Sequence, residues 1–252
     1  MPIHKTDAIV LNKRDFRETS LIVDLFTRDF GRLGGLLKGI RTEPAKFASN
    51  LEPFSLNEII FYSGRSPTLH LVTQADIKEN FTPIRQNIAK IGVASFMMEL
   101  LSAVMPLEDK NDEVFDLTVN CLNELKLTPN ADKIMTIFKI KMLSLSGFKP
   151  HFDSCISCSD KVLGQSKFSL VMGGLLCEKC EKKDFASRNI FRGTVASILH
   201  IEKNDLRTAL NLGMNPQIKR ELEVILNAFL NFHLEKELKS QKVLNKMAAV
   251  AI

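Results

Sequence analysis

The sequence predicts an α+β protein in which a small closed β-barrel precedes a set of helices that carries a four-cysteine metal module. Five short runs rich in Ile, Leu, Val and Thr fill the first 80 residues. From residue 83 to 147 the apolar residues recur with helical spacing. Two Cys-x-x-Cys pairs then follow. We expect a barrel domain at 1–80 and a helical domain at 81–252, with the metal module at 150–182.

The five runs have the alternation and the turn signals of short strands. In the third run, Leu33, Gly35 and Leu37 share one face, and Arg32 and Lys38 share the opposite face. Glycine within this run suits the sharp bending that a small barrel requires. The runs read "TDAIVLNKRDF", "TSLIVDLFT", "GRLGGLLKGI", "SLNEIIFYS" and "TLHLVTQADI".

Helical patterns occupy most of the rest of the chain. The first carries an apolar stripe that begins at Ile84, and two more precede Gly147. Later patterns cover 187–200 and 216–238, the last with Asn215 as its N-cap. The most apolar stretch, "IGVASFMMELLSAVM", contains Glu99 and is too short to span a membrane. With no signal-peptide pattern either, we expect a cytoplasmic protein with reduced thiols.

The cysteines are concentrated in one segment, "CISCSDKVLGQSKFSLVMGGLLCEKC". Two Cys-x-x-Cys pairs at this spacing favour one structural Zn(II) per chain over disulfides or a redox pair, which would need a single motif. The predicted ligands are Cys155, Cys158, Cys177 and Cys180. Cys121 lies alone in a helical pattern and reads as a plain buried thiol.

Catalytic patterns are missing from the sequence. It has no P-loop, no G-x-S-x-G elbow and no H-E-x-x-H. His200 and Glu202 form an H-x-E, but this follows both cysteine pairs instead of preceding one, so we read His200 as a helix-end residue. Four thiolates would also fill the zinc shell and leave no open position. We therefore expect a protein that is not an enzyme.

Positive charge is modest overall, at a formal +5, and is locally clustered in the barrel region. Such a stripe suits a phosphate backbone, although it could also be an ordinary solvated face. Phe16, Phe30, Phe61 and Tyr62 could stack bases or could fill the barrel. The candidate DNA-binding residues are Lys13, Arg14, Arg17, Arg28, Arg32, Lys38, Arg41 and Lys46.

The N-terminal segments "FRETSLIVDLFTRDFGRLGGLLKGIR" and "LEPFSLNEIIFYSGRSPTLHLVTQADI" resemble the RecO family of bacterial DNA-repair mediators. The cysteines of "CISC" and "CEKC" match the zinc module of many members. The resemblance covers most of the chain and is strongest in the first 80 residues. It implies an oligonucleotide/oligosaccharide-binding (OB) fold followed by a helical domain with the zinc module.

The same resemblance implies a non-enzymatic role in recombinational DNA repair. Such a protein would bind single- and double-stranded DNA, anneal complementary strands and help load the RecA recombinase onto DNA covered by single-stranded DNA-binding protein. Its partners would include the acidic C-terminal tail of that covering protein, and RecR. Its location would be the cytoplasm, in association with the nucleoid.

Two other readings stay open at this point. A zinc-stabilised RNA-binding or translation-associated factor could be built on the same kind of barrel, because OB folds accept either nucleic acid. A protein-interaction scaffold without nucleic-acid activity is the other.

Overall fold

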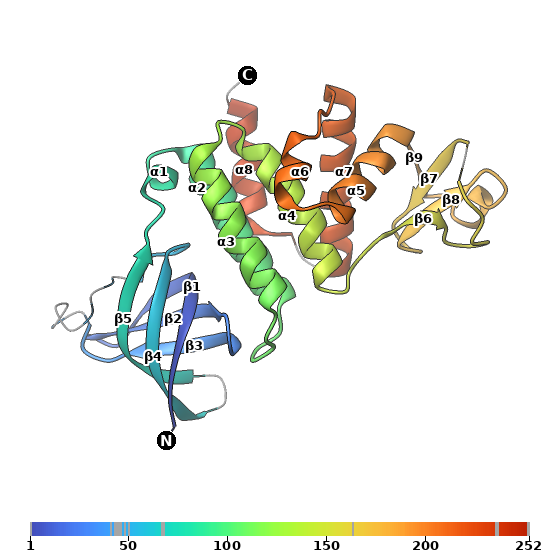
Figure 1. The fold of residues 1–252 in the computed structure, drawn as a ribbon. Helices are drawn as coiled ribbons and strands as arrows, with labels where there is room; N and C mark the ends of the chain where they lie inside the picture. The colour runs from blue at the N-terminus through green and yellow to red at the C-terminus, as the bar shows by residue number, and fades with distance from the viewer. Residues whose placement is uncertain are drawn as a thin grey trace. The chain divides into compact units, whose positions relative to one another are not determined.

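A computed structural model describes residues 2–40, 42, 47, 49, 51–66, 69–162, 164–234 and 237–250 (Figure 1). Of the candidate DNA-binding residues, Arg41 and Lys46 lie outside this set. The chain divides into two compact units. The first comprises residues 1–131 together with 238–252, and the second comprises residues 132–237.

The first unit contains the predicted barrel. Its strands close in the order β1-β2-β3-β5-β4, and every neighbouring pair is antiparallel except β3 and β5, which are parallel. This is an OB-like arrangement, and it confirms the expected barrel of five strands. The strands are β1 (Ile3–Phe16), β2 (Ser20–Thr27), β3 (Gly31–Leu37), β4 (Leu56–Ser66) and β5 (Leu69–Glu79).

The barrel interior follows the predicted alternation. Leu33 and Leu37 point into the core, whereas Arg32 and Leu36 are only half-buried on the outer face. Gly35 marks a close approach of side chains, since a Cβ there would lie 2.8 Å from Val72. Pairing between β1 and β2 shifts its register between Val10 and Asn12. Such an irregularity changes which face the following β1 side chains occupy.

The described residues of the first unit also form the helices α1 (Thr82–Arg85), α2 (Ile88–Val104), α3 (Asp112–Leu127) and α8 (Lys239–Val250). The prediction of a single helical stripe starting at Ile84 was wrong in one respect, because the helix is interrupted at Asn87. The Asn87 side chain accepts a hydrogen bond from the Lys90 backbone N–H and so caps α2. The C-terminal α8 packs on α2. Glu99 of α2 accepts hydrogen bonds from the first backbone N–H groups of α8, at Lys239 and Ser240.

The second unit joins helices to a small sheet whose strands run in the order β6-β8-β7-β9. Asn215 caps α7 as predicted, accepting from the Ile218 N–H at 2.8 Å. The helix expected at 187–200 instead begins at Arg192, after a short edge strand. The elements are α4 (Ala131–Leu145), β6 (His151–Cys155), β7 (Ser166–Ser169), β8 (Gly174–Cys177), η2 (Glu181–Lys183), β9 (Arg188–Ile190), α5 (Arg192–Lys203), α6 (Leu206–Asn211) and α7 (Pro216–Leu234).

Among the described residues, we find no helix that combines the length and the apolar character needed to cross a membrane.

Candidate metal centre and nucleic-acid interface

The four predicted zinc ligands come together in the second unit. Cys155 ends β6 and Cys177 ends β8, so each strand delivers one cysteine to a tight turn that carries the next. In the first turn the Ser159 N–H donates to the Cys155 carbonyl at 2.8 Å, and in the second the Cys180 N–H donates to the Cys177 carbonyl at 2.9 Å. All four sulfur atoms lie within 4.8 Å of one another.

The sulfur geometry fits a tetrahedral metal. Zn–S bonds of about 2.3 Å in a tetrahedron place the sulfurs about 3.8 Å apart. The Cys158 and Cys177 sulfurs are 3.8 Å apart, and all four thiols are free rather than disulfide-bonded. Burial alone would raise the pKa of Cys155, but hydrogen bonds from the backbone N–H groups of Cys177, Cys158 and Ser157 outweigh it and lower this pKa to about 6. These hydrogen bonds favour the thiolate form of Cys155, which is the form that binds a metal.

The cysteine module has little apolar core of its own. Its buried cluster consists of Cys155, Leu176 and Cys180, with a few partly buried neighbours such as Val162. A ring contact strengthens its base, where Phe152 stacks on Phe168 at a centroid distance of 5.2 Å. Such a module needs a further source of stability, and a four-thiolate metal site can supply it.

The remaining candidates for metal chemistry have structural roles. Cys121 is fully buried in α3, as expected of a plain buried thiol. His200 lies in the last turn of α5, where its carbonyl accepts from the Asn204 N–H. Glu202 is paired with Lys149 at 3.0 Å. Within the described part of the chain, the four cysteines are the one group of three or more potential ligands close enough to share a metal.

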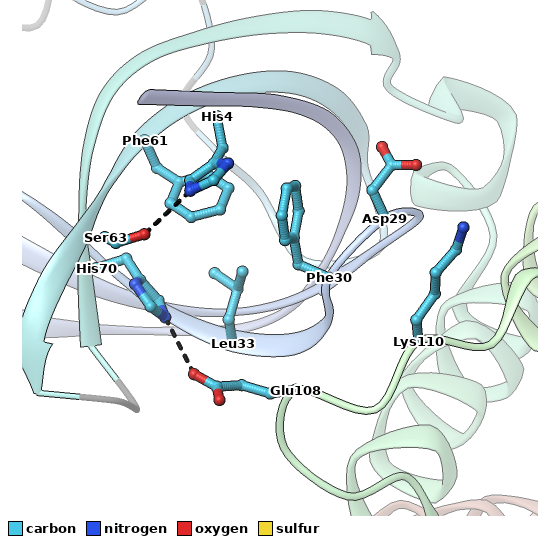
Figure 2. A pocket seen from close by; sticks show the side chains of 9 residues that line it. All are labelled: His4, Asp29, Phe30, Leu33, Phe61, Ser63, His70, Glu108 and Lys110. Carbon is cyan, nitrogen blue, oxygen red and sulfur yellow. Dashed lines mark hydrogen bonds and ion pairs between the residues drawn. The ribbon is translucent and has the colours of Figure 1, made fainter. Parts of the chain in front are cut away.

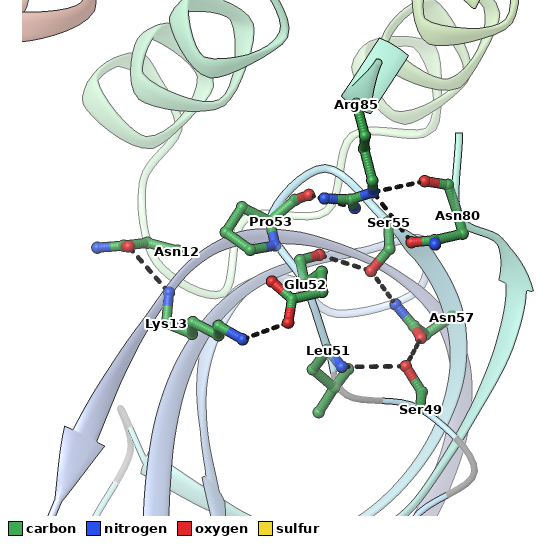
Figure 3. Close-up of polar contacts among 10 residues, drawn as sticks. All are labelled: Asn12, Lys13, Ser49, Leu51, Glu52, Pro53, Ser55, Asn57, Asn80 and Arg85. Atoms are coloured by element: carbon green, nitrogen blue, oxygen red, sulfur yellow. Dashed lines mark hydrogen bonds and ion pairs between the residues drawn. The ribbon is translucent and has the colours of Figure 1, made fainter. Parts of the chain in front are cut away.

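Three of the candidate DNA-binding residues are engaged inside the first unit. Lys13 turns toward the rim of the barrel and donates to Glu52 at 2.6 Å (Figure 3). Arg28 pairs with Asp116 of α3 at 2.5 Å and lies over the Phe115 ring. These contacts neutralise or occupy the cations, so a phosphate would have to compete for them.

Arg32 is the third engaged residue. Its guanidinium donates to the backbone carbonyls of Ser102 and Met105 at the C-terminal end of α2, the second at 3.0 Å. Carbonyls at a helix C-terminus have no partner within the helix, and a cation there is favourable. Arg32 therefore holds the end of α2 on the outer face of β3.

The other three described candidates are exposed. Arg14 and Lys38 are open to solvent beside the strand ends, and Arg17 occupies the β1–β2 turn, 5.2 Å from the Phe16 ring. No ion pair of these three side chains is found among the described residues. We name Arg14, Arg17 and Lys38 the exposed basic group.

The strand register places this group at one end of the barrel. Arg14 lies opposite Ile22, which lies opposite Leu36, so these residues share the outer face of β1, β2 and β3. Lys38 follows directly after β3 at the same end. At the other end of this face, Phe26 packs against Phe115 of α3. The helices thus cover one end of the face and leave the basic end open.

The aromatic candidates divide in a similar way. Phe61 is 1% exposed and fills the barrel core. Phe30 packs partly against that core. Phe16 and Tyr62 are half-exposed, and Phe16 lies beside the exposed basic group. Of the four rings, Phe16 is therefore placed best to stack a base near the exposed cations.

Comparison with known proteins identifies the family to which the chain belongs. The family model described as "Recombination protein O N terminal" matches residues 1–81, and the one described as "Recombination protein O C terminal" matches residues 85–242. The chain belongs to the RecO family. Its relatives include the "DNA repair protein RecO" of Dehalococcoides mccartyi, 31% identical over 94% of this chain and 92% of that protein. That of Alkaliphilus metalliredigens is 29% identical over 92% and 94% respectively. That of Bacillus pumilus is 29% identical over 98% and 95%.

RecO membership confirms the resemblance noted in the sequence. It supports a role in DNA repair and recombination with partners drawn from those processes, and RecO is not a known enzyme family. The OB-like barrel and the clustered cysteines agree with the fold expected of a zinc-containing member.

Sequence reasoning about this RecO chain missed the acidic partners of its basic residues. Glu52 and Asp116 lie 39 and 88 residues away from Lys13 and Arg28. No local pattern joins such pairs, because the barrel and the α2–α3 hairpin bring them together only in three dimensions. Only the acidic partner in α3 was indicated by a local pattern, because the first turns of this helix contain Asp112, Glu113 and Asp116.

Proposed function

We propose that the chain is a non-enzymatic DNA-binding mediator of recombinational repair. It binds single- and double-stranded DNA, anneals complementary strands and helps load RecA onto DNA covered by single-stranded DNA-binding protein. The proposed partners are the acidic C-terminal tail of that covering protein, and RecR. The proposed location is the cytoplasm, in association with the nucleoid. Residues 1–80 would be the DNA-binding domain, and residues 81–252 the helical domain with the zinc module.

The observation that carries this proposal is the exposed basic group on an OB-like barrel in a family of recombination proteins. OB folds bind oligonucleotides on the face of their second and third strands and on the loop that joins the first two. Arg17 lies in that loop, and Lys38 follows the third strand. Contacts to phosphates carry no sequence information, so binding should be insensitive to sequence.

The proposed mechanism of annealing is electrostatic. Two strands repel each other through their phosphates, and cations on the protein lower that repulsion while the bases find their partners. Base pairing then supplies the free energy, so no nucleotide hydrolysis is required. This agrees with a sequence that contains no P-loop.

Zn(II) is the metal we propose for the four-cysteine site. Bound there, it would stabilise the module and perform no chemistry, because four thiolates complete its usual coordination. The remaining candidate contacts, Lys13, Arg28, Arg32, Arg41 and Lys46, stay predictions. For the first three, DNA would have to displace an existing partner.

A triple substitution tests the proposal. Arg14→Ala, Arg17→Ala and Lys38→Ala together should weaken binding to single strands of any sequence. The slope of log K against log salt should become about 2 units less steep, since each phosphate contact contributes about 0.7. The matched control removes three exposed basic residues outside the barrel, Arg207, Lys219 and Lys246, with the same change in net charge.

Strand annealing should fall with the triple variant and not with the control. Equal effects of both sets would mean that only net charge matters, and the barrel face would lose its role. Competition between DNA and RNA strands of matched sequence separates the proposal from an RNA-binding factor. An absence of binding to either at low salt would favour a protein scaffold.

A further inference from the structure

A pocket of about 310 Å³ opens at the end of the barrel where β2 turns into β3 (Figure 2). Its walls carry four rings in contact. The His4 and Phe30 ring centroids are 4.7 Å apart, Phe30 meets Phe61 edge to face at 5.3 Å, and His70 meets Phe61 at 5.3 Å. This volume is at the lower limit of ligand pockets, so it suits one side chain better than an extended ligand.

The pocket is held by backbone contacts. The Glu108 N–H donates to the Arg32 carbonyl at 2.8 Å, which fixes the α2–α3 loop on β3. Gly31 is required there, because a Cβ at this position would overlap the backbone of Asp109. Glu108 has a φ of 58°, and its carboxylate lies 3.6 Å from the His70 ring. The carboxylate is thus positioned at the mouth before any ligand arrives.

The charge around the mouth is negative. The carboxylates of Asp29 and Glu108 line the pocket together with the ammonium of Lys110, and that ammonium pairs with Asp112 at 3.2 Å. The loop sequence "LEDKNDE" contains four carboxylates and one lysine. A nucleic-acid phosphate would be repelled here, and the exposed basic group lies at the opposite end of β2 and β3.

We propose that this pocket binds an arginine side chain presented by a basic protein partner. A guanidinium is planar and cationic, stacks on aromatic rings and pairs with carboxylates. Phe30 offers a half-exposed ring, and Asp29 and Glu108 offer the anions. DNA and the partner would then occupy opposite ends of the barrel. This inference does not depend on the proposed DNA activity.

The test uses the full chain and a peptide probe, Ac-Gly-Arg-Gly-NH2, followed by two-dimensional NMR. The peptide should shift the amide signals of His4, Phe30 and Phe61. The neutral analogue with citrulline in place of arginine should bind at least about threefold more weakly, as loss of a cation–π contact and of ion pairing implies.

Glu108→Gln should weaken binding of the arginine peptide about two- to fivefold, the effect of one partly exposed ion pair. Glu113→Gln removes the same charge from an exposed position that does not line the pocket, and it should change binding less than about twofold. The backbone contacts of Glu108 remain in the glutamine variant, so the fold is retained.

Four results would overturn the proposal. Equal weakening by the two variants would indicate general attraction, and equal binding of the citrulline peptide would exclude recognition of the cation. Shifts caused by deoxynucleosides but not by the arginine peptide would make this a base pocket. Shifts that depend only on protein concentration would assign the surface to a second copy of the chain.

Discussion

Arg32 and Lys38 were predicted to share one face of the third strand, but their substitutions should have different effects. We expect loss of Arg32 to lower stability and loss of Lys38 to weaken DNA binding. Arg32→Ala removes a charged donor from the carbonyls of Ser102 and Met105. Hydrogen bonds of charged groups contribute about 1.5–3 kcal/mol each, and water can replace part of this at a half-buried site. We therefore expect a loss of about 2–3 kcal/mol. This corresponds to a fall in Tm of roughly 4–12 °C for a domain of this size.

Lys38→Ala should leave stability unchanged, because no hydrogen bond or ion pair of Lys38 is found among the described residues. It should weaken binding of single-stranded DNA. One phosphate contact contributes about 0.7 to the salt slope, which amounts to about fivefold in affinity at 0.1 M salt. Arg32→Lys separates charge from geometry, because lysine keeps the cation and lacks the planar fork. It should lose part of the stability and keep the DNA affinity.

The assay is a thermal melt of each variant combined with DNA binding measured at 15 °C, where all should be folded. The reasoning is wrong if Arg32→Ala keeps its Tm and loses DNA affinity to the same extent as Lys38→Ala. It is also wrong if Lys38→Ala lowers Tm by several degrees. The first result would mean that the contact between Arg32 and α2 contributes little, and the second would mean that Lys38 has a structural role.

Two further predictions concern the second unit. Cys158→Ser should abolish stoichiometric zinc in elemental analysis and expose the amides of 151–190 to hydrogen exchange. The control Cys121→Ala should retain one zinc per chain. One zinc per chain in both variants would contradict the assignment of Cys158 as a metal ligand. Lys139 is 2% exposed and hydrogen-bonded to Asn227, and burial lowers its pKa to about 8. Since this folded-state pKa is below the unfolded value of about 10.4, the unfolded chain binds more protons between the two. Between about pH 8 and about pH 10.4 the free energy of unfolding should therefore rise with pH, at most by about 1.4 kcal/mol per pH unit. Lys139→Met should remove that rise in urea titrations, and the exposed control Lys219→Met should not; identical slopes would contradict the assignment.

The barrel was predictable because its signals are local. Alternation in the third run placed Leu33 and Leu37 inside and Arg32 outside, as observed. The metal ligands were predictable for the same reason, since cysteine spacing reports the site directly. The sheet around them was not predicted. Its strands are three to five residues long and include segments such as "SKFS", too short for a periodic pattern.

Helix α8 was missed because its decisive contact is distant in sequence. The backbone N–H groups at its start are satisfied by Glu99, 140 and 141 residues earlier, and no capping residue of its own is required. The break before α2, by contrast, had a local signal in Asn87, a strong N-cap residue. A continuous apolar stripe across the break concealed it.

The basic residues show where sequence patterns stop being informative about binding. Period-two alternation gives the face of a strand on which a side chain lies, but it does not say what else covers that face. Here α2 and α3 occupy one end of the outer face, and Arg28 and Arg32 at that end become contacts between the barrel and the helices. The same face remains open at Arg14 and Lys38. Its capacity for phosphates is therefore set by the cations that the helices leave exposed, and the total of lysines and arginines in the barrel region overstates it.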